Sequence, residues 1–126
     1  MNVKTILGAL FILLMSATAM AQTKTADFTG VWTSEGDLSA KGRLNMEIEQ
    51  RGLELFGTAS YTDYAGNRQS GVCKISGTVC GSKAAFNIVL NKKTMATGSM
   101  VKTGNTIKFV TGPSRIFPDK AYVYKN

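Results

Sequence analysis

The chain has 126 residues, with 15 Lys and Arg against 8 Asp and Glu, and carries a net charge of +7 at neutral pH. It contains no histidine, which removes the usual general base, Ser/His and Cys/His dyads and most zinc sites. The basic residues favour anionic partners, yet they are scattered in runs no longer than Lys92-Lys93. We therefore expect no catalytic activity, cofactor or metal site, and no nucleic-acid partner.

The N-terminal segment is typical of a secretory signal peptide. Lys4 precedes an uncharged apolar run over 6–15, and Ala19-Met20-Ala21 matches a signal-peptidase site. The run is shorter than the roughly 20 apolar residues of a spanning helix, so we expect no membrane span. These features predict cleavage after Ala21 and a periplasmic or secreted protein, with a retained N-terminal anchor as the alternative. Cleavage would remove one basic residue, leaving 105 residues with a charge of +6 as a single domain over 22–126.

Alternation of apolar and polar residues dominates the rest of the chain, and it is typical of half-buried β-strands. Nothing repeats with the period of an amphipathic helix. In chain order, the expected strands span 27–34, 43–51, 53–63, 68–80, 83–90, 94–103, 106–111 and a final segment within 115–125.

Short turns connect these strands as successive hairpins. Two-residue turns are predicted at 51–52, 81–82 and 104–105, and three-residue loops at 65–67 and 91–93. The turns set Ile48 opposite Leu55, Val79 opposite Ala84 and Met100 opposite Phe109. The apolar residues then share one inner face: Leu44, Met46, Ile48, Leu55, Ala59, Tyr61, Ile75, Phe86, Ile88, Met100, Ile107 and Phe109.

Phe86 is expected between Gly77 and Gly98, where two missing side chains give room to a large ring. Large residues beside small ones are typical of the interior of a small tapering barrel. An open meander of this length would leave two exposed edges, which pairing of the last strand with the first removes. The predicted fold is an all-β, eight-stranded antiparallel up-and-down β-barrel.

Phe28, Gly30 and Trp32 on the first strand, followed by an antiparallel meander, resemble the opening of the calycin barrels, which include lipocalins, fatty-acid-binding proteins and avidins. The resemblance implies that Trp32 closes one end of the barrel; the alternative is that it is an ordinary core aromatic. The chain is short for a lipocalin, lacks the helical pair of fatty-acid-binding proteins and lacks the additional tryptophans of the avidin biotin site. It is most similar to a small, bacterial-type lipocalin-like barrel.

Arg115 lies in Ser114-Arg115-Ile116-Phe117, which resembles the Arg-x-Tyr/Phe segment that holds a ligand carboxylate in fatty-acid-binding proteins. Alternation across the turn at 112–114 points Arg115 outward, and Pro118 can reverse that direction. Tyr122 and Tyr124 share a face and are expected to seal the barrel against Trp32.

The two cysteines, Cys73 and Cys80, leave two alternatives open. A turn at 76–77 would place them opposite one another, as a disulfide in an exported protein requires. The turn at 81–82 instead places both on one strand, roughly 23 Å apart at 3.3 Å per residue, beyond the about 7 Å limit between Cα atoms of a bridge.

Two functions fit the sequence. The first is a non-catalytic barrel that binds a small apolar, amphipathic or anionic molecule, with an expected ligand-binding set of Trp32, Met46, Tyr61, Phe86, Met100, Phe109 and Arg115. The second is an envelope protein-binding module, an inhibitor or assembly factor, acting through the polar loops 35–42 and 63–68 and an outward pair, Val89 and Met95. Oligomeric state is open in both.

Overall fold

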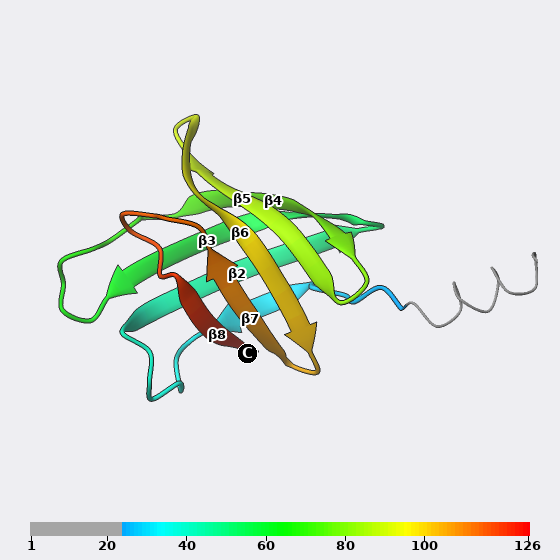
Figure 1. The fold of residues 1–126 in the computed structure, drawn as a ribbon, viewed down its shortest axis with the longest axis horizontal. Helices are drawn as coiled ribbons and strands as arrows, with labels where there is room; N and C mark the ends of the chain where they lie inside the picture. The colour runs from blue at the N-terminus through cyan, green and yellow to red at the C-terminus, as the bar shows by residue number, and fades with distance from the viewer. Residues whose placement is uncertain (1–23) are drawn as a thin grey trace, which may run out of the picture.

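The computed structural model describes residues 24–126 as a closed antiparallel barrel (Figure 1). It confirms the predicted all-β fold of eight strands. The predicted signal peptide lies outside the described residues. The strands are β1 (Gly30–Thr33), β2 (Gly42–Arg51), β3 (Glu54–Asp63), β4 (Cys73–Cys80), β5 (Lys83–Leu90), β6 (Lys93–Thr103), β7 (Thr106–Thr111) and β8 (Lys120–Lys125). The part of the chain that the structure describes contains no helix long and apolar enough to cross a membrane.

Each strand pairs with its neighbours in chain order, and β8 returns to pair with β1. Up-and-down order gives the barrel two different ends. We call "the closed end" the end formed by the β2–β3, β4–β5 and β6–β7 turns together with residues 26–28. "The mouth" is the opposite end, formed by the β1–β2, β3–β4, β5–β6 and β7–β8 connections (Figure 1).

The predicted registers of the β4–β5 and β6–β7 hairpins are confirmed, with Val79 opposite Ala84 and Met100 opposite Phe109. The register between β2 and β3 is corrected, because Ile48 lies opposite Gly57 rather than Leu55. The turn there is formed by residues 52 and 53, since Gly52 takes the first turn position with φ of 62°. Gly81 and Gly104 occupy the same position in their turns. The shift is two residues, so the inner face is unchanged.

The β5–β6 connection also differs from the prediction. Its turn has two residues, Asn91 and Lys92, both with positive φ, the backbone of a tight type I′ hairpin. A bulge after Ile88 compensates for the missing loop residue, so Phe86 still lies opposite Gly98. Val89 therefore lies opposite Thr94, and the expected outward pair of Val89 with Met95 was wrong.

All twelve residues of the predicted inner face are buried. The rings of Phe86 and Phe109 stack with 4.9 Å between centroids. The core also includes residues that the alternation did not identify: Phe28, Ala96, Phe117 and Val123. An eight-stranded barrel is just wide enough for its own side chains to fill.

Phe86 lies between Gly77 and Gly98 as predicted, but the reason for the glycines is different. A Cβ at Gly77 would overlap the main-chain oxygen of Ala85, and a Cβ at Gly98 would overlap that of Val110. Both glycines therefore permit neighbouring backbones to approach closely where the barrel wall curves. Space for the Phe86 ring is not their main role.

At the closed end, the first strand and the segment before it cover the core. Trp32 is fully buried, and its Nε1–H donates to the Phe28 carbonyl at 2.9 Å. The Gln50 side chain holds the segment by accepting from the Phe28 N–H (2.8 Å) and donating to the Ala26 carbonyl (2.9 Å). The Lys125 ammonium lies 6.0 Å above the Trp32 ring, a cation–π distance.

The expectation that Tyr122 and Tyr124 seal this end was wrong. Val123 is the buried residue of β8, and Tyr122 and Tyr124 alternate to the outside. Pro118 lies before β8, so the alternation begins only at Lys120. The structure leaves both Cys73, which is buried, and Cys80, which is exposed, as free thiols on β4.

Candidate functional site

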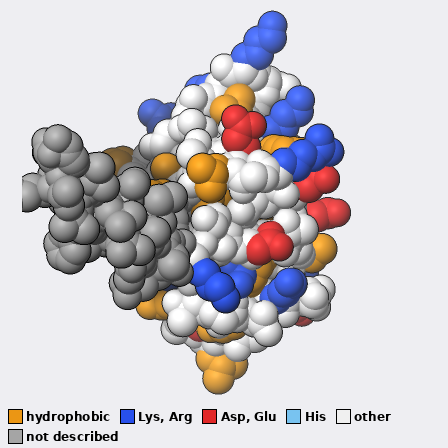
Figure 2. All heavy atoms as spheres, turned by 90° about the vertical axis from the view of Figure 1, so that its right-hand side faces the viewer, with side chains coloured by type: hydrophobic (Ala, Val, Ile, Leu, Met, Phe, Trp, Pro, Cys, Tyr) orange, Lys and Arg blue, Asp and Glu red, His pale blue; other side chains and the backbone are white. Residues whose placement is uncertain are grey.

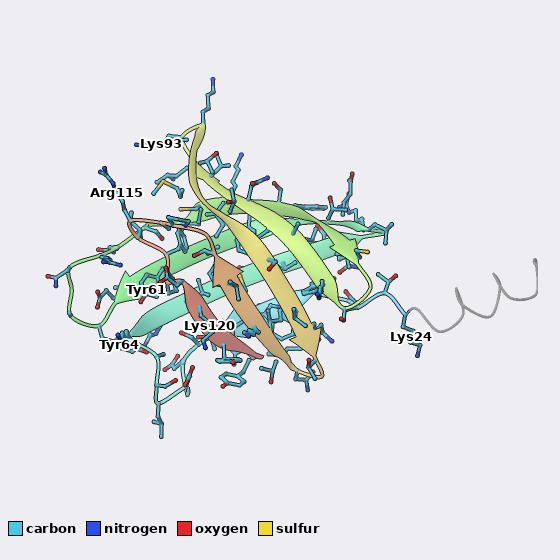
Figure 3. The ribbon with its side chains drawn as sticks, in the orientation of Figure 1. Lys24, Tyr61, Tyr64, Lys93, Arg115 and Lys120 are labelled. Carbon is cyan, nitrogen blue, oxygen red and sulfur yellow. The ribbon has the colours of Figure 1, made fainter. Side chains whose placement is uncertain are left out.

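A pocket of about 690 Å³ opens at the mouth, and we call it the mouth pocket. Its volume lies within the range of about 300–1,000 Å³ common for small-molecule sites. It is bounded by the β1–β2, β3–β4 and β7–β8 connections and by the facing ends of β2, β3 and β8 (Figure 3). Its lining residues are Asp37, Ser39, Ala40, Lys41, Gly42, Tyr61, Asp63, Asn67, Arg68, Phe117, Pro118, Asp119, Lys120, Ala121 and Tyr122.

The pocket exists because the barrel closes over only part of its height. β1 pairs with β8 through two residues, Trp32 with Lys125 and Thr33 with Tyr124. Beyond them Ser34 ends β1: its Oγ accepts from the Leu44 N–H at 2.8 Å and donates to the Gly42 carbonyl at 3.1 Å. The seam between β2 and β8 therefore separates toward the mouth.

Tyr61 of β3 forms the floor of the mouth pocket. Its main chain is fixed by Ser70, whose Oγ accepts from the Tyr61 N–H at 2.9 Å, while the Ser70 N–H donates to the Tyr61 carbonyl at 2.9 Å. Only 6% of Tyr61 is exposed. Gly42 provides the space for it, because a Cβ there would overlap the Tyr61 hydroxyl.

The Tyr61 hydroxyl has no hydrogen-bond partner among residues 24–126, although it lines the pocket. Burial, and secondarily the negative charge of Asp63, raises the pKa of Tyr61 above its usual value. The hydroxyl is therefore a neutral donor and acceptor over the physiological pH range. A phenol hydroxyl at the floor of a pocket, open to it and without a protein partner, is a candidate to bind a polar group of a ligand.

Phe117 closes the barrel interior beneath the pocket. It lies in the β7–β8 connection, is 1% exposed, and its ring centroid is 6.3 Å from that of Tyr61. Ser114 holds this connection: its Oγ donates to the Met95 carbonyl at 3.0 Å and accepts from the N–H groups of Ile116 and Phe117. Thr111 adds a bond from its Oγ1 to the Pro118 carbonyl at 2.8 Å.

Charged side chains of both signs surround the pocket. Within residues 24–126 the ion pairs are Arg43 with Glu35 and Arg51 with Glu49, and neither pair lines the pocket. Six charged residues line the pocket without an ion pair in the described chain: Asp37, Lys41, Asp63, Arg68, Asp119 and Lys120. Asp37 Oδ1 accepts from Ser39, and Asp63 Oδ1 accepts from the Ala65 N–H.

The structure separates the expected ligand-binding residues. Trp32 lies at the closed end, whereas Met46, Phe86, Met100 and Phe109 lie in the core, each at most 3% exposed. A cavity wide enough for a ligand would leave free surface on these four side chains, so the described interior is filled by the barrel's own residues. Their role in binding stays a prediction that would require displacement of packed side chains.

Only Tyr61 of the expected set lines the mouth pocket. Arg115 is exposed on the β7–β8 connection, outside the lining residues, and points away from the barrel (Figure 3). The basic residues at the pocket are Lys41, Arg68 and Lys120 instead. Sequence alternation missed Phe117: it pointed Arg115 outward and so placed Phe117, two residues later, on the same outward face, whereas the structure buries it.

The closed end offers less to a ligand. Figure 2 faces this end and shows Lys and Arg side chains interspersed with acidic ones, without one continuous charged or apolar patch on the visible surface. Within residues 24–126, no group of three or more Cys, Asp and Glu side chains is arranged to hold a metal ion.

The fold and the pocket define this protein as a closed eight-stranded antiparallel barrel with a polar and aromatic site at one end. Comparison of the chain with protein-family models, with curated proteins and with solved structures found no match. The assignment of function therefore depends on the geometry of the site.

Proposed function

We propose that this protein is an exported, non-catalytic, calycin-like barrel that binds a small amphipathic molecule in the mouth pocket. The observation that carries the proposal is Tyr61, which is largely buried but whose hydroxyl, without a partner in the described chain, is open to a pocket of about 690 Å³. The hydroxyl stays open to the pocket, so a ligand group that replaces water there gains a directed hydrogen bond at a partly enclosed site.

The lining suits a ligand with both apolar and polar parts. Phe117 and Tyr61 provide an aromatic floor, while Lys41, Arg68 and Lys120 provide cationic groups for a carboxylate or another anion at the rim. The packed core below Phe117 favours binding at the mouth over binding deep in the barrel.

Binding is tested with the mature chain, residues 22–126, and the amphipathic anionic dye anilinonaphthalene sulfonate, displaced by decanoate. We expect saturable, displaceable binding that Tyr61→Phe weakens about tenfold, the loss of roughly one hydrogen bond to a partly buried group. Tyr124→Phe is the matched control, because Tyr124 is exposed on the outside of β8. Absence of saturable binding, or equal effects of the two variants, would contradict the proposal.

A second candidate function is protein binding through the mouth loops. Leu38 in the β1–β2 connection is fully exposed (101%), and Tyr64 in the β3–β4 connection is 59% exposed. The Tyr64 N–H donates to the Lys41 carbonyl at 3.0 Å, which ties the two connections together. A stoichiometric complex recovered from envelope extract and lost on Leu38→Ser would favour this function over the first.

A further inference from the structure

We infer that the mouth pocket takes its ligand as a short extended peptide, which pairs main chain to main chain with the free edge of β8. This inference rests on the proposed function and specifies the chemical class of the ligand. Its basis is the unpaired main chain of Lys120 and Tyr122 beside the unpartnered Tyr61 hydroxyl.

The hydrogen bonds of β8 to the β6–β7 hairpin show which way its main-chain N–H and C=O groups point. The Lys125 N–H donates to the Asn105 carbonyl, and the Thr111 N–H donates to the Asp119 carbonyl, each at 2.9 Å. Main-chain groups alternate in direction along a strand, so the N–H and C=O groups of Lys120 and Tyr122 point away from β7.

On that other side, β8 is paired only near its C-terminal end. The β1 partners reach Lys125 and Tyr124 and stop there. Within residues 24–126, the main-chain groups of Lys120 and Tyr122 that face the seam therefore have no strand partner. They present two donors and two acceptors at the spacing of a β-strand, and a peptide backbone has the complementary spacing.

On the opposite side of the seam, the main-chain groups of β2 nearest the mouth are already hydrogen-bonded. Ser34 Oγ already satisfies the Leu44 N–H and the Gly42 carbonyl on β2. The free β8 edge runs from Lys120 to Tyr122 and is preceded by Pro118, which has no N–H. At about 3.3 Å per residue the three residues of this edge span about 10 Å, which limits the paired part of the guest to three or four residues.

The two faces of the seam specify the side chains of the guest. Side chains that point inward meet Ala121, Tyr61 and Phe117, which suit a small apolar residue. On the outward side, Lys120 is exposed on β8 and Lys41 lines the same pocket, together with Asp37, Asp63 and Asp119. Neither lysine has a carboxylate partner in the described chain. The geometry therefore favours a peptide in which acidic and apolar residues alternate.

The probe is the acetylated and amidated pentapeptide Glu-Val-Glu-Val-Glu, titrated into the ¹⁵N-labelled mature protein. We expect the Tyr122 amide proton to exchange with solvent about tenfold more slowly in the complex, because it gains a hydrogen bond. Two N-methylated versions provide the sharper test: one is methylated on both valines, the other on the second and third glutamates.

One set of peptide N–H groups must face β8, and the other must face β2. Methylation of the first set should weaken binding about tenfold or more through lost hydrogen bonds, whereas methylation of the second set should have little effect, because Ser34 already satisfies β2. Equal affinities of the two methylated peptides would overturn the main-chain pairing.

Charge recognition is tested separately. Lys120→Glu should weaken binding of the acidic pentapeptide about tenfold through like-charge repulsion, and Lys74→Glu on β4 is a control with the same change in net charge. Equal losses in the two variants would indicate non-specific attraction and overturn the specific contact. If the amphipathic dye binds and the peptide does not, the peptide inference is wrong and the proposed function stands; if neither binds, both are wrong.

Discussion

Replacing Gly77 with alanine tests why glycine is required in the barrel wall. The added Cβ would overlap the Ala85 main-chain oxygen and lie 3.1 Å from the Phe86 Cα. β4 cannot move aside freely, because Gly77 is also paired with Leu55 of β3. The overlap is relieved only if β4 and β5 move apart. Overpacking of this kind costs about 1–3 kcal/mol of stability.

Gly112→Ala is the matched control. Its Cβ would meet only the Thr97 oxygen, at an ordinary 3.9 Å, and Gly112 does not have a positive φ. Both substitutions reduce the entropy of the unfolded chain equally, a gain of about 0.4–1 kcal/mol. The difference between the two variants therefore isolates the steric cost at Gly77.

The assay is urea unfolding of the mature chain, with the slope of the transition checked for constancy. We expect Gly112→Ala to be neutral or stabilising and Gly77→Ala to be less stable than it by about 1–3 kcal/mol, or roughly 4–20 °C in melting temperature for a domain of this size. Equal midpoints for the two variants would refute the close backbone approach. Destabilisation at Gly112 alone would reverse the reasoning.

Three further predictions concern single positions. Lys92→Gly should stabilise the protein by about 1 kcal/mol in urea unfolding, because Lys92 has φ of 67° in the β5–β6 turn; a loss of stability would contradict this. Because the folded state raises the pKa of Tyr61, this residue's contribution to the free energy of unfolding is complete below the unfolded-state pKa and declines as the pH rises above about 10. Tyr61→Phe should therefore reduce the loss of stability between pH 9 and 11. An unchanged loss would exclude Tyr61 as its source. Cys80 is exposed and should be alkylated rapidly, whereas Cys73 is buried and should be alkylated only on unfolding. A monomer that gains the mass of two hydrogen atoms on reduction would instead show a disulfide.

The fold was predictable because independent local signals agreed. Apolar alternation defined one inner face, and Gly81 and Gly104 marked turns whose register then matched apolar partners such as Met100 and Phe109. Even the misplaced turn near Gly52 left the inner face intact, because the error was an even number of residues.

The site was less predictable, because it depends on where strands end. Nothing in the alternation shows that Ser34 replaces a strand partner of β2, or that β8 loses its partner beyond Tyr124. The connection that carries the buried Phe117 is held by Ser114, whose Oγ donates to the Met95 carbonyl 19 positions earlier and accepts from the nearby Phe117 N–H. The interior residues were identified correctly as a face, but a face does not reveal whether it encloses a cavity or a packed core.

The position of the chain ends determines how the barrel can be tethered. Ala26 donates its N–H to the Gly81 carbonyl, and Asn126 donates its N–H to the Val31 carbonyl, so both ends of the described chain leave at the closed end. A linker attached at either end would hold the protein to a sensor chip with the mouth directed toward the solution. Immobilised protein should therefore bind the same ligands as free protein, whichever end carries the linker.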